Sequence, residues 1–307
     1  MSHRSLAWLT IVGTVWLLPT PAAGPRDLEG LWTNATITPF ERSKEFAGKE
    51  FLTEKEAADF EKRALENANR DRRGANAESD VAGAYNDFWF ERGTKVVPTR
   101  RTSLVVDPPD GKIPPLTPAA QKAAAARAEV LRHLPTGPED LGLPDRCILW
   151  PTAGPPMVPG GYNNNYQIVQ APGYVAILVE MIHDVRIIPL DGRPHLPSNI
   201  RQWMGDSRGH WEGNTLVVDT TNFTDKTHFR GSDQNLHLVE RFTRTGPDTI
   251  LYEFTVDDPT AFTKPWKGQA PLTKTDGPIY EYACHEGNYG MTNILTGARA
   301  QEKKGVK

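Results

Sequence analysis

Residues 166–256 carry the strongest fold signal in the chain. They include Tyr174-Val-Ala-Ile-Leu-Val-Glu-Met181, an apolar and β-branched run of strand length. The breaker pair Pro172-Gly173 precedes this run, and Asp191-Gly192 ends the next one with a dipeptide typical of two-residue hairpins. Turn residues then recur at sheet-like intervals with no helical run between them. The sequence therefore predicts an antiparallel β-meander and disfavours parallel βαβ units.

We expect this meander to close into a calycin- or lipocalin-like antiparallel barrel over residues 147–300. Gly30-Leu-Trp32, near the start of the mature chain, resembles the Gly-x-Trp on the first strand of calycins. Gly209-His-Trp211 repeats this tripeptide, so the barrel prediction rests on the meander. Residues 24–146 should add this strand, two helices and long Pro- and Gly-rich loops packed on the barrel. The first helix begins at a Thr53/Glu56 capping box, and the second begins at Pro118. We also expect a loop over 260–276, a last strand over 279–284 and a disordered tail over 301–307.

Residues 1–23 have the pattern of a secretory signal peptide. A short positive region is followed by an apolar stretch over residues 6–18 and a small-residue end near Ala22. Cleavage there would place the protein in the periplasm or outside the cell. The alternative is an uncleaved anchor, although the apolar stretch is short for a membrane span. No later segment is apolar enough to cross a membrane.

The overall composition is that of an ordinary globular protein. The 307 residues are 38% hydrophobic and 24% charged, so a full core is expected. The formal net charge of -3 argues against a nucleic-acid partner. Gly and Pro, at 26 each, fit a protein rich in loops.

The chain has two cysteines, Cys147 and Cys284. Thiols outside the cytoplasm tend to pair, so export predicts a disulfide between them, which would enclose the whole meander. Two buried free thiols are the alternative. A metal role is disfavoured because neither cysteine belongs to a CxxC pair.

Ionisable side chains occur within the expected strands. If residues 180–188 form an unbroken strand, its period-two alternation places Glu180, Asp184 and Arg186 on one face. On residues 236–244, Glu240 shares a face with apolar residues and His237 shares the other with Arg241.

Two interpretations fit this pattern. One is a set of salt-bridge ladders on the exterior of the sheet. The other is a barrel of about eight to ten strands with ionisable groups turned inward around a ligand cavity. We take the second as the working hypothesis.

Histidine and arginine supply the candidate site. His195 follows Asp191-Gly192 at a hairpin end, where loop residues can converge on a barrel mouth, although a plain surface histidine would look the same. Arginine can clamp a carboxylate or enolate, and imidazole can move a proton near neutral pH. The candidate catalytic residues are His195, His237, Asp184, Asp219 and Glu240, and the candidate ligand-binding residues are Arg186, Arg193, Arg241 and Trp211.

Other kinds of site have weaker support. The histidines lack the spacing that puts two imidazoles on one metal ion, so we expect neither a metal nor another cofactor. Residues 205–209 spell G-x-S-x-G around Ser207, but the buried strand before it and the helix after it, which a nucleophile elbow requires, are missing from the pattern.

A family resemblance rests on motifs in the C-terminal half. The pattern DGRPH from Asp191, GHWEGNTLVVDTT from Gly209, LHLVERF from Leu236, Asp258-Pro259 and FTKPW from Phe262 resembles a large family of exported bacterial β-rich proteins. The resemblance covers roughly residues 147–300 and implies a periplasmic or secreted setting. It implies no particular activity, cofactor or catalytic residue.

These features predict an exported, disulfide-bonded β-barrel that acts on a small polar or anionic organic molecule. Metal-independent acid/base chemistry of the lyase, isomerase or hydrolase kind is the expected mode. A non-catalytic carrier is one alternative. An envelope interaction protein, which would dock through Trp150, Trp203 and Trp266, is the other. The sequence does not define the oligomeric state.

Overall fold

A single antiparallel sheet dominates the computed structural model, which describes residues 26–69, 76–78 and 90–305. The expected signal peptide lies outside these residues. Eleven strands belong to the sheet, and its main path runs in the order β5-β4-β3-β1-β11-β9-β8-β7-β6. The strands are β1 (Gly30–Thr33), β2 (Val105–Asp107), β3 (Asn165–Ala171), β4 (Tyr174–Val179), β5 (Val185–Pro189), β6 (Asp206–Glu212), β7 (Thr215–Thr221), β8 (His237–Gly246), β9 (Thr249–Asp257), β10 (Trp266–Gln269) and β11 (Leu272–Lys274).

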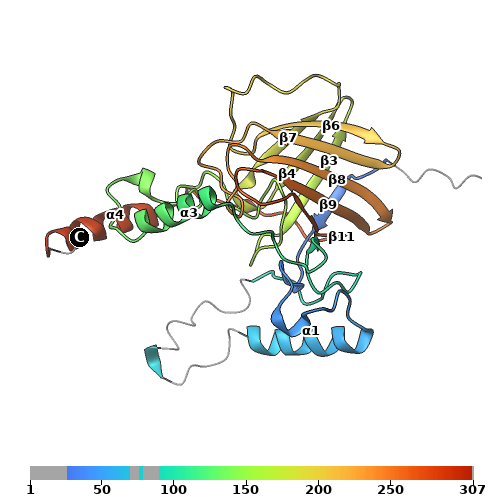
Figure 1. Cartoon of the computed structure of the whole chain (residues 1–307), viewed down its shortest axis with the longest axis horizontal. Coiled ribbons are helices and arrows are strands. Elements are labelled where there is room, and N and C mark those ends of the chain that lie inside the picture. Colours follow the sequence, from blue (N-terminus) through green and yellow to red (C-terminus); the bar gives the residue numbers. More distant parts are fainter. Residues whose placement is uncertain (1–25, 70–75, 79–89, 306–307) are drawn as a thin grey trace, which may run out of the picture.

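The sheet curls into a nearly closed barrel (Figure 1). Its two edge strands, β5 and β6, lie side by side without pairing, and we call this junction the seam. The prediction of an antiparallel β-barrel is confirmed at this level, whereas the relationship to calycins stays a prediction. β1 closes the gap between two meanders because it pairs with both β3 and β11.

Side-chain alternation along the strands builds the core. On β9 every second residue, from Ile250 to Val256, is buried. Large aromatic side chains meet at the centre, where they fill the space that a ligand would need. The hollow interior that we expected is therefore replaced by packed side chains, the largest of which include Trp32, Trp266, Tyr166, Tyr252, Phe242 and Phe254.

A glycine brings the two edges of the seam together. A Cβ placed on Gly209 of β6 would lie 2.7 Å from Leu190 Cδ2 and 2.8 Å from Ile188 Cγ2. Only a residue without a side chain allows β5 to approach this closely. The chain between the two edge strands, residues 190–205, is an irregular loop.

The expected strand over residues 180–188 is interrupted. The short 3₁₀ turn η4 (Met181–His183) separates β4 from β5, and Ile182 and His183 adopt positive φ angles of 59° and 48°. Glu180 is thus separated from Asp184 and Arg186 by a turn. The face that we expected these three residues to share does not exist.

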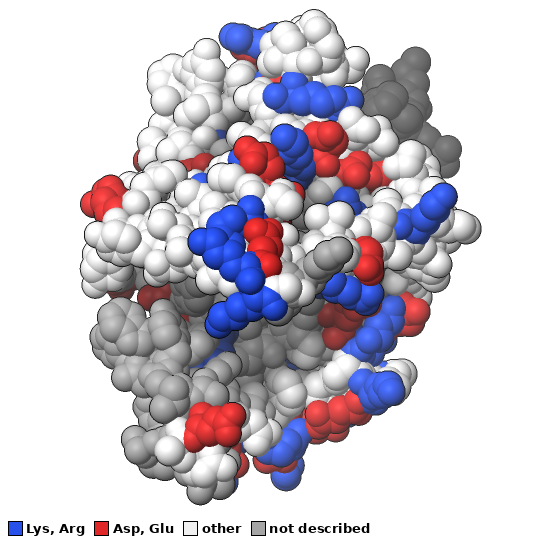
Figure 2. All heavy atoms as spheres, turned by 90° about the vertical axis from the view of Figure 1, so that its left-hand side faces the viewer, with Lys and Arg blue, Asp and Glu red and all other residues white. Residues whose placement is uncertain are grey.

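Three α-helices lie outside the barrel among the described residues: α1 (Glu54–Ala68), α3 (Pro118–Val130) and α4 (Tyr289–Glu302). The Thr53/Glu56 capping box at the start of α1 is confirmed. α1 packs into a separate apolar cluster with Phe46, Leu52 and Val96, and Figure 1 shows it below the barrel instead of over it. α3 and α4 extend to the left of the barrel, and the face on that side carries mixed Lys, Arg, Asp and Glu side chains (Figure 2).

The C-terminal region differs from two expectations. The segment 260–276, expected to be a loop, contains β10 and β11, whereas residues 279–284 form no strand. The disulfide between Cys147 and Cys284 is confirmed, with 2.04 Å between the sulfur atoms. It fastens the Pro-rich segment 143–155, here called the strap, to the region before α4. No helix in the described part of the chain has both the length and the apolarity that a bilayer span requires.

Candidate functional site

An ion pair is buried inside the barrel near the seam. Arg186 of β5 donates from Nη1 to Oε1 of Glu240 at 3.0 Å and from Nη2 to Oε2 at 2.5 Å. The two side chains are 2% and 0% exposed. Burial opposes the charge on Arg186, but the carboxylate of Glu240 outweighs burial and raises the pKa of the guanidinium. Arg186 is therefore held in its charged form.

Neutral hydroxyl groups complete this network. The Tyr252 hydroxyl donates to Oε1 of Glu240 at 2.8 Å. Burial, followed by the charge of Glu240, raises the pKa of Tyr252 well above its usual value, so this hydroxyl keeps its proton. Ser207 lies 3.4 Å from Nη2 of Arg186 and 2.9 Å from the hydroxyl of Thr220. Ser207 thus belongs to a buried strand network and lacks the exposed turn of a nucleophile elbow.

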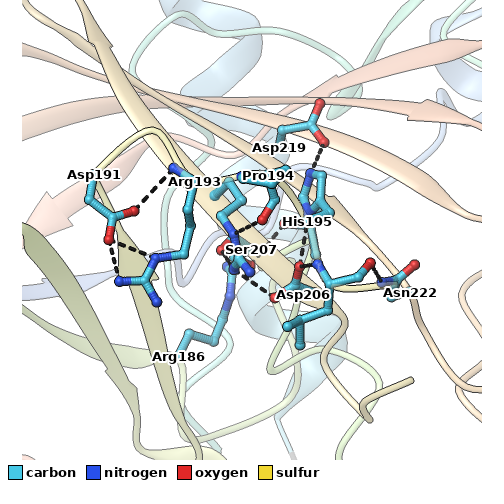
Figure 3. Close-up of polar contacts among 12 residues, drawn as sticks. Arg186, Asp191, Arg193, Pro194, His195, Asp206, Ser207, Asp219 and Asn222 are labelled. Carbon is cyan, nitrogen blue, oxygen red and sulfur yellow. Dashed lines mark hydrogen bonds and ion pairs between the residues drawn. The ribbon is translucent and has the colours of Figure 1, made fainter. Parts of the chain in front are cut away.

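His195 lies between two carboxylates on the outer side of the barrel (Figure 3). Its Nδ1 is 3.0 Å from Oδ2 of Asp206 on β6, and its Nε2 is 2.8 Å from Oδ1 of Asp219 on β7. Each ring nitrogen thus faces a carboxylate oxygen at hydrogen-bonding distance, one on β6 and one on β7. His195 therefore clamps the loop 190–205 onto two neighbouring strands.

A second histidine extends this cluster. Nε2 of His237 on β8 lies 2.7 Å from Oδ2 of Asp219. This hydrogen bond is the main cause of a raised pKa at His237. Burial opposes the charge on Asp219, but the hydrogen bonds from His237 and His195 outweigh it and lower the pKa of this carboxyl. Asp219 thus contacts both His195 and His237, which brings three of the predicted catalytic residues together.

The barrel wall contains a pocket at the seam. Its volume is about 480 Å³, which suits a small organic molecule. We call it the seam pocket. Both edge strands, the end of the loop and one strap residue contribute to its lining, which consists of Ile148, Asp184, Val185, Arg186, Ile187, Arg201, Gln202, Trp203, Met204, Gly205, Asp206 and Ser207.

Two polar atoms on residues that line the seam pocket have no hydrogen-bond partner among the described residues. They are Nε of Arg186 and Oδ2 of Asp184, and both are buried. Burial raises the pKa of Asp184 to about 6, although the positive charge of His183 acts in the opposite direction. Two residues of the pocket lining therefore hold a buried donor and a buried acceptor without partners, and the carboxyl group has a pKa close to neutral.

Of the remaining predicted ligand-binding residues, Arg193 and Arg241 lie on the outside, whereas the ring of Trp211 packs against the core. Arg193 pairs with Asp191 at the exposed hairpin end, and Arg241 donates to Glu212 at 2.9 Å. The ring of Trp211 is contacted by Arg26. The expectation that His237 and Arg241 point into the barrel is wrong, because their side chains are 43% and 40% exposed. The inner position on β8 belongs to Glu240.

The predicted tryptophan docking patch does not form. Trp266 is completely buried in the core, where it stacks with Phe229. Trp203 is 37% exposed and borders the seam pocket. The described residues also contain no group of three or more His, Cys, Asp or Glu side chains arranged to hold a metal ion.

Several site residues were missed from the sequence. Asp206 links His195 to the seam pocket, and Arg201 and Trp203 border that pocket. Residues 205–209 were considered only as a possible nucleophile elbow, so this part of the chain was not expected to line a pocket. Tyr252 had no signal beyond its place in an expected strand.

No family model, curated protein or solved structure matches this chain. The candidate site therefore rests on its own geometry.

Proposed function

We propose that this is an exported protein whose seam pocket binds a small polar organic molecule and acts on it by acid/base chemistry. The observation that carries the proposal is the pair of unpartnered atoms, Arg186 Nε and Asp184 Oδ2, in residues of one pocket wall. A buried polar group without a partner destabilises a protein by about 1–3 kcal/mol. A molecule with one acceptor and one donor would satisfy both groups.

The charges around the pocket favour a hydroxyl or carbonyl compound. Glu240 already neutralises Arg186 through two hydrogen bonds, so the guanidinium offers its remaining N–H more than its charge. Asp184 disfavours a second negative charge nearby. Polyols and hydroxy ketones have the required donor and acceptor groups and carry no negative charge.

Asp184 is the group best suited to move a proton. A general acid or base works best when its pKa lies near the working pH, and the pKa of Asp184 is raised to about 6. His195 holds the loop 190–205 from outside, His237 contacts Asp219, and neither histidine borders the pocket. In this proposal Asp184 is the catalytic residue, and the His195 clamp positions the pocket wall.

Native mass spectrometry of the purified protein tests binding directly. We expect a co-purified small molecule in the wild type that is lost or reduced in Asp184→Asn. The matched control is Asp276→Asn, which makes the same change at an exposed carboxylate outside the pocket lining. Equal occupancy in both variants would contradict the assignment of the pocket.

Turnover can be tested separately from binding. Incubation of the identified molecule with protein in D₂O, followed by NMR, detects proton abstraction as deuterium incorporation. We expect incorporation with the wild type and none with Asp184→Asn at saturating concentration. Binding without incorporation in the wild type would favour a non-catalytic carrier.

A further inference from the structure

A second pocket lies on the other side of the strap. Its volume is about 140 Å³. The neighbouring residues Ile148 and Leu149 border different pockets, because Ile148 lines the seam pocket and Leu149 lines the second one. We call the second one the strap pocket. It is lined by Leu143, Pro144, Leu149, Trp150, Pro151, Gly154, Pro155, Lys226, Thr227, His228 and Phe229.

The walls of the strap pocket are mostly apolar and restrained. Trp150 and Leu149 face it from the strap, and Phe229 faces it from the opposite segment, where Trp266 stacks against it. Three prolines limit the backbone of the strap, and the disulfide at Cys147 ties the strap to the C-terminal region. A cavity with fixed walls loses little entropy when a rigid molecule enters it.

Only a few polar groups reach the strap pocket. Thr227 is occupied, because its hydroxyl donates to the carbonyl of Trp203 at 2.8 Å. Nη1 of Arg127 on α3 lies 3.1 Å from each ring nitrogen of His228.

The imidazole of His228 is therefore a neutral polar group. Burial and the charge of Arg127 lower the pKa of His228, against the opposite effect of the carboxylates Asp233 and Asp225. The exposed Lys226 and this imidazole, whose two nitrogens both face Arg127, are the other polar groups on the lining.

We propose that the strap pocket binds a single aromatic ring with one uncharged hydrogen-bonding substituent, in contact with Trp150, Leu149 and Phe229. The volume supports a ligand of this size, because a protein cavity of about 150 Å³ with apolar walls holds benzene. The substituent lies toward His228 and Lys226. This site is separate from the seam pocket, since the two share no lining residue.

Benzyl alcohol is a suitable probe, and the indole N–H signals in a ¹H–¹⁵N NMR spectrum report where it binds. We expect benzyl alcohol to shift the Trp150 signal in a saturable way and to leave the Trp203 signal, from the seam pocket, unchanged. Absence of a saturable Trp150 shift would overturn the proposal. Because this measurement uses the wild-type protein, it does not depend on a variant that must fold.

A pair of variants adds a second readout. Leu143→Trp places a large side chain in the strap pocket, whereas Leu141→Trp makes the same change at another half-buried leucine outside the lining. Saturation transfer from protein to benzyl alcohol should disappear in Leu143→Trp and persist in Leu141→Trp. Persistence in folded Leu143→Trp would contradict the assignment. Asp184→Asn should leave benzyl alcohol binding intact, so failure here and failure of the seam-pocket function are distinguishable.

Discussion

Arg186 and Glu240 form a bidentate ion pair inside the barrel, with Nη1–Oε1 and Nη2–Oε2 distances of 3.0 Å and 2.5 Å. The pair joins β5, at one edge of the sheet, to β8, the third strand from the opposite edge. It therefore links strands from the two sides of the seam. The seam pocket borders the same arginine.

Removal of the buried carboxylate should strongly destabilise the fold. Glu240→Gln leaves Arg186 charged and partly unpaired in the core, and breaking such a pair lowers the free energy of unfolding by about 3–5 kcal/mol. Glu212→Gln makes the same change in the exposed pair with Arg241 and should have little effect on the free energy of unfolding. Urea denaturation measures both values. Equal losses would show that burial of the pair is irrelevant to stability.

Asp184 should make the protein less stable as the pH rises. Its folded pKa, about 6, lies above its usual value of 3.8, so the folded state favours the protonated form. That contribution is complete below about pH 4 and is lost as the pH passes 6.

Asp184→Asn should therefore raise the free energy of unfolding by about 1–2 kcal/mol at pH 8, after allowance for partial solvent screening, and have little effect at pH 4. Chemical denaturation at both pH values checks this. A gain of the same size at both would contradict the assigned pKa.

The two partners of the His237–Asp219 pair stabilise the fold over different pH ranges. The pKa of His237 is raised, so its contribution is present below about pH 6.5 and is lost as the pH rises through the folded pKa. The pKa of Asp219 is lowered, so its contribution is present above about pH 4 and is lost at lower pH.

His237→Gln should flatten the decline of stability above pH 6.5 by less than about 1 kcal/mol, because the pair is partly exposed. His210→Gln, at a more exposed histidine, is the matched control. Thermal melting from pH 5 to 9 provides the comparison, and identical curves for wild type and His237→Gln would refute the coupling.

Because Gly209 lies so close to Ile188 and Leu190 at the seam, we expect a single added methyl group there to destabilise the fold. Gly209→Ala would place Cβ within 2.8 Å of Ile188 and Leu190, and overpacking of this kind lowers the free energy of unfolding by about 1–3 kcal/mol. Gly246→Ala on β8 is the control, since an added Cβ there meets no atom within 4 Å. Denaturation midpoints compare the two. A neutral Gly209→Ala would mean that the seam is looser than the structure indicates.

Loss of the disulfide should destabilise the whole barrel. The bond closes a loop across a separation of 137 residues, and removal of a bridge of this kind lowers the free energy of unfolding by about 2–5 kcal/mol. The variant Cys147→Ser/Cys284→Ser should melt at a lower temperature than the oxidised wild type. A reducing agent should lower the melting temperature of the wild type and leave that of the variant unchanged.

Local patterns were sufficient to predict much of the fold. Alternation over residues 236–244 indicated the faces of β8 correctly, since Glu240 is buried and His237 and Arg241 are not. The capping box at Thr53 and the pairing of the two cysteines also followed from sequence. These features depend on neighbouring residues or on the number of available partners, so one chain is enough to recognise them.

The sequence by itself determined an antiparallel β-protein with one disulfide and a concentration of His, Arg and carboxylate groups in its C-terminal half, because turn residues and period-two alternation are local properties. Only the tertiary structure decided which of these groups meet. Alternation divides a strand into two faces but does not say which one turns inward, and that choice depends on how the whole sheet curls. For this reason the buried partner of Arg186 is Glu240, the histidines lie outside, and the candidate pocket lies in the seam of the wall instead of at the centre of the barrel.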